Sequence, residues 1–300
     1  MTLSVKRLGQ TFFAEVRGVD LTRTVDDATH RAINDALLEH AVLYFPEQQI
    51  TDAQQEEFSK WYGSLEVTFE DPKLYTAHLS NLYNDGQIRE PDSRKSTFLR
   101  ANQLWHSDST MFQAPARLSF LSAHAVAPEG GETEWADMRA AWEALPELRK
   151  KELEGLVLEH DFQKSRRVTD HVFDEEERRR WPPLLHPLVR VHEETGCRAL
   201  YVGSQATRVI GWPRERGEEL IQELIEFATQ DQFIYTHRWS VHDFMIWDNR
   251  RVNHRGRPWD EDKYPRDLRR TTVKGAIPTM EDGHPVNEYE RATSLRTATG

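Results

Sequence analysis

A histidine and an aspartate two positions apart, His106 and Asp108 in ANQLWHSDS, have the clearest potential for chemistry. In extended backbone, residues i and i+2 point to the same side, so this imidazole and carboxylate can bind one metal ion together. Of the thirteen histidines, only His106 is followed by Asp two positions later. His254, in WDNRRVNHRGR, would complete the 2-His-1-carboxylate triad of non-haem Fe(II) oxygenases. The alternative is a surface histidine beside three arginines.

The segment KYPRDLRRTTV supplies Arg266, Arg269 and Arg270 soon after His254. On a strand, Arg266 and Arg270 share parity, so both can face the interior while Arg269 faces out. A buried arginine is unfavourable unless it meets an anion, and its planar fork pairs carboxylates bidentately. The pattern favours two anionic ligands near the metal, and 2-oxoglutarate, which would chelate iron, is one candidate. A solvated strand edge is the alternative.

Strand signals dominate the elements that must position these residues. We expect strands over 118–127 and 268–276, a hairpin over 188–203, and two further strands within 232–249. Helix signals include a capping box, Thr51-x-x-Gln54, and an apolar stripe between Pro213 and Gln230. The pattern predicts a mainly β chain, a sandwich or barrel with helices outside.

Several segments carry weaker signals. Residues 67–101 show no clear periodicity and predict a long loop of the kind that covers sites. The charged runs RKSTFLR and EEERRR predict exposed faces. His192, in a rival His-x-acid pair, is expected on a solvated hairpin turn. Residues 277–300 are expected to form a poorly ordered tail.

Composition narrows the class of protein. A net charge of −11 argues against a nucleic-acid partner, which would need a basic face. No apolar run approaches the ~18–20 residues of a membrane span, and the N-terminus lacks the features of a signal peptide. The single cysteine, Cys197, excludes an internal disulfide. We therefore expect a cytoplasmic protein with no membrane partner.

The chain resembles the taurine dioxygenase/2,4-dichlorophenoxyacetate dioxygenase family of Fe(II)/2-oxoglutarate-dependent enzymes. The runs that carry the likeness are HAVLYFPEQQITDAQQEEFSKWYGSLE, ANQLWHSDS, PEGGETEWADMRAAWEALP, FIYTHRWSVHDFMIWDNR, HRGRPWD and LRRTTV. It is most similar to the 2,4-dichlorophenoxyacetate dioxygenase type. The resemblance implies a double-stranded β-helix (jelly roll) with flanking helices, in one domain over residues 1–276.

The resemblance also implies roles for individual residues beyond the metal ligands His106, Asp108 and His254. Thr133 and Arg266 match positions that bind the distal carboxylate of 2-oxoglutarate. Arg270 matches the position that binds the acidic group of the primary substrate, and Asn102 matches a position close to that substrate. The spacing from His254 to Arg266 is one residue longer than the family pattern, so Arg266 and Arg269 could exchange roles.

The implied activity is hydroxylation of a small organic acid with dioxygen, releasing succinate and carbon dioxide. An aryloxyalkanoate is the favoured substrate, cleaved at its ether to a phenol and glyoxylate. A taurine-type sulfonate or another carboxylate is the alternative, followed by a non-enzymatic metal-binding barrel. The natural substrate, its chirality and the oligomeric state, a homo-oligomer included, stay open.

Overall fold

The computed structural model describes residues 3–69, 71–167, 169, 172–276, 280–281 and 284–285. The strands are β1 (Ser4–Arg7), β2 (Ala14–Arg17), β3 (Val42–Phe45), β4 (Ala77–Ser80), β5 (Ala116–Ala125), β6 (Thr133–Asp137), β7 (Val157–His160), β8 (Leu184–Pro187), β9 (Val189–Val191), β10 (Arg198–Leu200), β11 (Ala206–Val209), β12 (Ile234–His237), β13 (Phe244–Asp248), β14 (Val252–Gly256), β15 (Asp267–Lys274), β16 (Met280–Glu281) and β17 (His284–Pro285). The helices are α1 (Asp27–His40), α2 (Asp52–Lys60), α3 (Arg94–Arg100), α4 (Met138–Ala144), α5 (Glu147–Leu153), α6 (Phe162–Arg167), α7 (Glu175–Arg180) and α8 (Arg214–Ala228), with 3-10 turns η1 (Ala101–Gln103) and η2 (Asp231–Phe233). The chain is mainly β with flanking helices, as the sequence predicts.

Two sheets form the centre of the molecule. The larger has seven strands in the order β1-β2-β3-β13-β5-β15-β4, and the smaller has the order β12-β6-β14. Most pairs are antiparallel; β2 and β3 run parallel. Strand β15 of the larger sheet carries the arginine-rich segment, whereas β14 of the smaller sheet carries His254. The two sheets therefore supply different parts of the candidate site.

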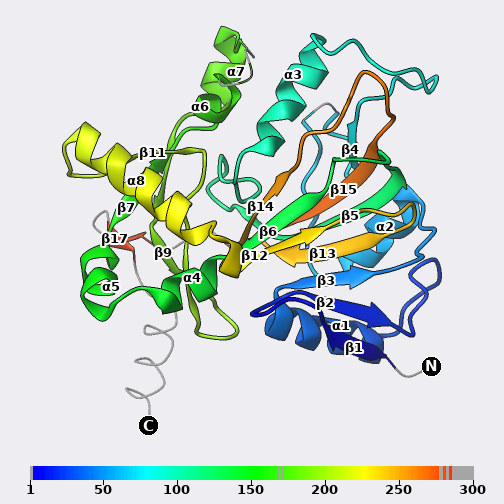
Figure 1. Ribbon diagram of the computed structural model, residues 1–300, viewed down its shortest axis with the longest axis horizontal. Helices are drawn as coiled ribbons and strands as arrows, with labels where there is room; N and C mark the ends of the chain where they lie inside the picture. The colour runs from blue at the N-terminus through cyan, green and yellow to red at the C-terminus, as the bar shows by residue number, and fades with distance from the viewer. Residues whose placement is uncertain are drawn as a thin grey trace.

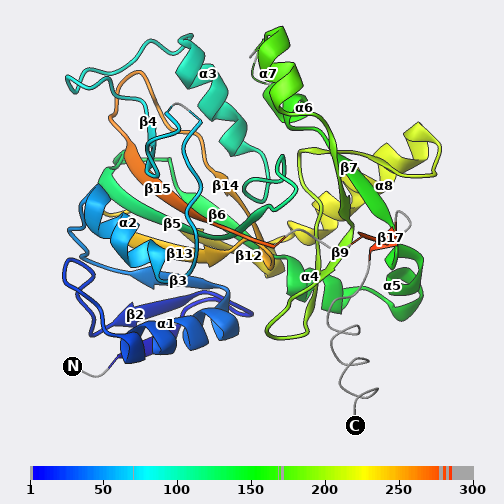
Figure 2. The same cartoon turned by 180° about the vertical axis from the view of Figure 1, so that it is seen from behind.

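The apolar core between these sheets explains their pairing. Trp135 on β6 and Trp247 on β13 are almost fully buried, and their ring centroids lie 5.8 Å apart. Leu121 and Leu268 belong to the same cluster. On strands, alternate residues share a face, so the opposite face of the large sheet presents a second cluster that α1 and α2 cover (Figure 2).

Local signals in the sequence account for the best-defined helices. Thr51 and Gln54 form the predicted capping box at the start of α2. Asp26 accepts a hydrogen bond from the Thr29 backbone and so caps α1. In α8 the predicted stripe is buried on one face, through Leu220, Ile221, Leu224 and Ala228.

The remaining helices divide between two places. In both views α4, α5 and α8 lie on the side of the molecule away from α1, where α4 and α8 share an apolar cluster with β7, β10 and β11 (Figures 1 and 2). Helices α3, α6 and α7 stand together at one end of the molecule. Within the described residues, no helix is long and apolar enough to cross a membrane.

The prediction of a long loop over residues 67–101 was wrong in part. The segment contains β4, which pairs with β15 at the edge of the large sheet, and α3, which Ser93 caps. RKSTFLR is α3 itself, and its residues after Arg94 are buried or half-buried, not an exposed face. Four-residue strands and seven-residue helices are too short to show a clear period, so long-range pairing decided this segment.

Two further predictions have different outcomes. His192 is only 1% exposed, and its Nε2 lies 2.8 Å from Asp248 Oδ2, because the hairpin packs over the turn after β13. The prediction that this histidine is solvated was therefore wrong. The run EEERRR forms α7 and is mostly exposed, as predicted.

Most of the 277–300 tail lies outside the described residues, apart from the paired strands β16 and β17.

Candidate metal centre and its two cavities

The backbone around His106 pairs directly with β14. His106 N donates to His254 O at 3.0 Å, and His254 N donates to His106 O at 2.8 Å. This isolated bridge brings together two histidines that are far apart in sequence, with ring centroids 4.3 Å apart. His106 Nδ1 lies 2.7 Å from the Leu104 carbonyl, which can only accept, so Nδ1 carries the proton and Nε2 is available as a metal ligand.

Asp108 lies between the two imidazoles. Its Oδ1 is 3.9 Å from His106 Nε2, and its Oδ2 is 3.7 Å from His254 Nε2. Ser119 on β5 donates to Asp108 Oδ2 at 2.7 Å, and Asn249 in turn donates to Ser119 Oγ at 2.9 Å. These polar contacts orient the carboxylate before any ion binds.

The electrostatics suit a cation. Burial lowers the pKa of His106 and lowers that of His254 to about 3, with the neighbouring His106 adding to the effect. Both imidazoles are therefore neutral and able to bind a metal ion at neutral pH. Burial by itself would raise the pKa of Asp108, but Arg270 leads the cationic groups that hold it at about 2.

The donor set fits a divalent transition metal. One ligand atom from each of His106, Asp108 and His254 lies within 4.8 Å of the others, and all three residues are buried. Two neutral imidazoles and one carboxylate, with further positions left open, are the donors typical of non-haem Fe(II) oxygenases. The geometry thus brings the three predicted ligands together.

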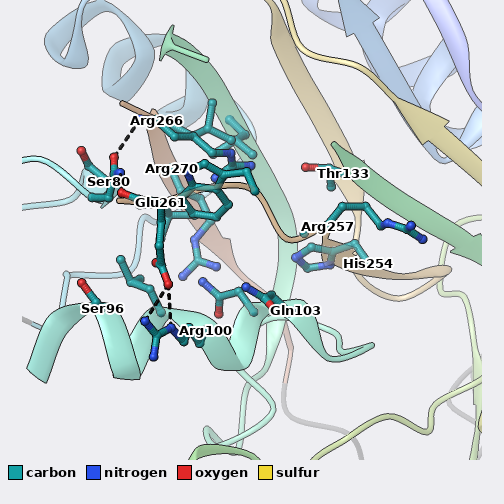
Figure 3. Close-up of a pocket in the computed structure, with 18 of the residues that line it drawn as sticks. Ser80, Ser96, Arg100, Gln103, Thr133, His254, Arg257, Glu261, Arg266 and Arg270 are labelled. Carbon is teal, nitrogen blue, oxygen red and sulfur yellow. Dashed lines mark hydrogen bonds and ion pairs between the residues drawn. The ribbon is translucent and has the colours of Figure 1, made fainter. Parts of the chain in front are cut away.

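A small cavity of about 70 Å³ opens on one side of the histidines. Its walls include Thr133 from β6 and Arg266, which precedes β15. Figure 3 shows Arg266 and Arg270 on one side of this cavity, with Thr133 and His254 on the other. Arg100 of α3 pairs with Glu261 at 2.7 Å across the rim.

Arg266 is a buried cation held by the protein frame. Its side chain donates to the Gly131 carbonyl at 3.1 and 3.3 Å, and its guanidinium lies 4.9 Å from the Trp259 ring centroid. A Cβ at position 131 would lie 3.1 Å from the Arg266 side chain, and the φ of Gly131 is +69°. Burial lowers the pKa of Arg266 to about 10, so it stays charged at neutral pH.

The neighbouring Arg269 points to another part of the surface. It forms ion pairs with Asp52 at 2.8 Å and with Asp267 at 3.0 Å, and it does not line the small cavity. Thr133, in contrast, lines the small cavity. Its Oγ accepts from Trp239 Nε1 at 2.9 Å, which leaves the hydroxyl proton free to donate.

A larger cavity of about 420 Å³ opens on the other side of the site. Helices α3, α6 and α7 supply much of its wall, and its aromatic and sulfur-containing side chains are Phe69, Phe98, Met111, Phe162 and Trp181. Arg270 and Asn102 border both cavities. Arg270 also donates to Asp108 Oδ1, so one guanidinium reaches from the strand to the carboxylate of the candidate metal centre.

Some groups around the site were not foreseen from the sequence. Ser119 and Asn249, which orient Asp108, lie in ordinary strand and turn patterns. Arg166 of α6 lines the larger cavity, but in the run QKSRR it looks like one more surface cation. No local signal distinguishes these residues, because their positions depend on which elements pack together.

Comparisons with known proteins identify the family of this chain. Residues 4–272 match the model of the taurine catabolism dioxygenase TauD, TfdA family. The alpha-ketoglutarate-dependent 2,4-dichlorophenoxyacetate dioxygenase of Cupriavidus pinatubonensis is 41% identical, over 91% of this chain and 98% of the relative. The (S)-phenoxypropionate/alpha-ketoglutarate-dioxygenase of Sphingobium herbicidovorans is 37% identical, over 84% and 88%.

A solved structure is also similar to this chain. The crystal structure of AAD-2 in complex with Mn(II) and N-oxalylglycine superposes with a TM-score of 0.88 at 39% identity, covering 94% of this chain and all of that chain. The fold and site define a metal-dependent oxygenase, and the chain belongs to the TauD/TfdA family of dioxygenases. It is therefore an oxidoreductase, which excludes the alternative of a non-enzymatic barrel.

Proposed function

We propose that this protein is an Fe(II)- and 2-oxoglutarate-dependent dioxygenase that hydroxylates an aryloxyalkanoate acid. The observation that carries the proposal is that two cavities meet at one His-Asp-His centre, each bordered by buried or half-buried arginine. Two cavities allow two organic anions to reach the same metal ion. The names of the similar enzymes from C. pinatubonensis and S. herbicidovorans support this class of substrate.

In this proposal the small cavity binds 2-oxoglutarate. Arg266 pairs with its distal carboxylate, and the Thr133 hydroxyl donates to the same group. Supporting this, Arg266 is buried and faces the cavity, whereas Arg269 is already engaged by two aspartates. A bidentate arginine in a dry pocket is well suited to a fixed carboxylate.

The larger cavity binds the primary substrate. Arg270 pairs with the acidic group next to the metal, and Asn102 of η1 borders the same space. The aromatic side chains of the wall hold an apolar ring at the far end. Such a cavity, mostly apolar with a few polar groups near the reacting atom, is typical of small-molecule sites.

The bound metal supplies the activation of dioxygen that oxidises 2-oxoglutarate to succinate and carbon dioxide and hydroxylates the substrate. The residues of the chain place the carbon between the ether oxygen and the carboxylate next to the centre. Hydroxylation of that carbon gives a hemiacetal, which collapses to a phenol and glyoxylate. Burial of the site excludes bulk water from the reacting atoms.

We also propose that the large sheet and the β12-β6-β14 sheet are the two halves of a double-stranded β-helix, in one domain ending near residue 276. The tryptophan-rich core between them supports this arrangement. A single cooperative transition on thermal unfolding is expected, and two separate transitions would contradict the single domain.

The test is a substrate panel with the iron-loaded enzyme, in which succinate release is measured for each acid. Phenol and glyoxylate should form in step with succinate when an aryloxyacetate is added, and the neutral amide of the same molecule should react far more slowly. Rapid succinate release with taurine and none with any aryloxy acid would replace the proposed substrate by a sulfonate. Release with no acid in the panel would refute the proposal.

A further inference from the structure

Arg166 is a second buried cation in the larger cavity. It lies on α6 and is only 7% exposed. Its guanidinium carbon lies 4.4 Å from the ring centroid of Phe98 and 4.7 Å from that of Phe162. Its Nε has no hydrogen-bond partner, and the side chain forms no ion pair with any residue that the structure describes.

The charges near Arg166 do not neutralise it. Burial lowers its pKa to about 9, and the nearby Arg270 lowers it further than Asp108 raises it. Asp108 already accepts from Ser119 and Arg270 and is one of the three metal ligands. Both arginines line the larger cavity, and Asp108, the carboxylate that Arg270 already contacts, forms no ion pair with Arg166 among the described residues.

Other buried arginines of this chain show how unusual this is. Arg250 pairs with Asp248 at 2.6 Å, and Arg251 donates to the Leu38 carbonyl. Arg266 donates to the Gly131 carbonyl. A buried charge normally has such a partner, because leaving it unpaired is costly. The two phenyl rings attract the guanidinium through their faces but supply no counter-charge.

We propose that Arg166 and Arg270 together form the anion-binding end of the larger cavity, with the acidic group of the primary substrate bound between them. The inference rests on the proposed function and deepens it: the substrate has one compact anionic group near the metal, followed by an apolar body among Phe69, Met111 and Trp181. Arg166 is then a residue that determines specificity for acids.

The variant Arg166→Met removes the charge but keeps an unbranched side chain that can pack between the two phenyl rings. Arg167→Met is the matched control, because Arg167 is the next residue of the same helix and is exposed. The measurement is anaerobic calorimetry of 2,4-dichlorophenoxyacetate binding to the protein loaded with iron and 2-oxoglutarate. Steady-state kinetics and the Tm are measured in parallel.

For Arg166→Met we expect the Kd and KM of the acid to rise by about 10- to 100-fold, the loss expected for one charge-assisted interaction. The Michaelis constant for the co-substrate, the binding of the neutral amide and the behaviour of Arg167→Met should be unchanged. Arg166→Lys should recover part of the affinity. The Tm of Arg166→Met without substrate should be equal to or above that of the native chain, because an unpaired buried charge is removed.

The outcomes separate the two proposals. If the native enzyme binds taurine or an alkyl sulfate but no aryloxy acid, the proposed substrate is wrong. Weaker binding of that other acid by Arg166→Met still supports the anion-binding pair. If Arg166→Met binds every acid as tightly as the native chain, the inference is overturned. A lower Tm of this variant would then show that Arg166 only holds α3 and α6 together. Failure of the native enzyme to bind any acid overturns both.

Discussion

The two cavities beside the His-Asp-His centre share a border but are built differently. In the small cavity, Thr133 lies on a strand and Arg266 directly precedes one. The arginine donates to the carbonyl of Gly131. Short helices, α3, α6 and α7, supply much of the wall of the larger cavity. There Arg166 has no such partner among the described residues.

This difference matches the two kinds of ligand that the cavities are proposed to bind, a constant co-substrate and a variable primary substrate. Sheet hydrogen bonds fix the Thr133 wall of the small cavity, so this wall suits a ligand that is the same in every turnover. The larger cavity depends on the packing of short helices and on an aromatic cluster, both of which can change without disturbing the sheets. We infer that residues on or next to the sheets bind the co-substrate, whereas the short helices determine which primary substrate is accepted.

The largest expected effect comes from substituting the candidate metal ligands, which both cavities border. In His106→Ala, Asp108→Ala or His254→Ala, succinate release should fall more than about 100-fold, because removing even a residue that only supports a ligand costs about 10–100-fold. Bound iron, measured by elemental analysis, should fall with it. His124→Ala, a histidine outside the centre, is the control. Full activity with unchanged iron in any of the three would remove that residue from the site.

The next test separates the small cavity from the larger one. Arg266→Ala should raise the Michaelis constant for the co-substrate 2-oxoglutarate by about 100-fold or more, since breaking a buried ion pair costs roughly 3–5 kcal/mol. The KM of the primary substrate should change much less. Arg269→Ala is the matched control, because its ion pairs lie elsewhere. If Arg269→Ala impairs 2-oxoglutarate binding and Arg266→Ala does not, the two arginines have exchanged roles.

A smaller effect is expected at the support of the centre. Ser119→Ala removes the hydroxyl that orients Asp108, and iron affinity should fall by about tenfold. The affinities for both organic ligands, measured at saturating iron, should fall together, because both cavities border the same ion. Ser122→Ala on the same strand, whose hydroxyl contacts His124, should leave iron binding unchanged. An effect on one ligand alone would place Ser119 in a single cavity.

The smallest effect concerns the helices around the larger cavity. Arg94 of α3 pairs with Glu177 of α7 at 2.5 Å across its rim, and the arginine is largely exposed. Arg94→Ala should change the KM of the primary substrate by less than about fivefold and in a salt-dependent way, because exposed ion pairs contribute little. The Michaelis constant for the co-substrate should not change. Arg17→Ala, which breaks another exposed pair, is the control, and an equal effect there would mean that the rim pair has no special role.

Much of the molecule could be predicted from local patterns. The His106-x-Asp108 spacing, the capping box at Thr51 and the apolar stripe of α8 all depend on residues within a turn or two of one another. The parity of Arg266 and Arg270 similarly agrees with their common cavity. Such signals act through local hydrogen bonds and side-chain direction, so they are visible in the chain before it folds.

Other features were decided only by the tertiary structure. The hairpin residue His192 is buried because it packs over Asp248, and α3 lines a cavity because it stands opposite α6 and α7. Arg166 and the exposed Arg167 are neighbours on α6, and they differ in which face of the helix each side chain occupies. Burial and pairing depend on contacts between segments far apart in sequence, so identical residue types in one charged run acquire opposite environments. The sequence by itself determined the candidate metal ligands and the local elements, whereas long-range packing determined which charges enter the cavities.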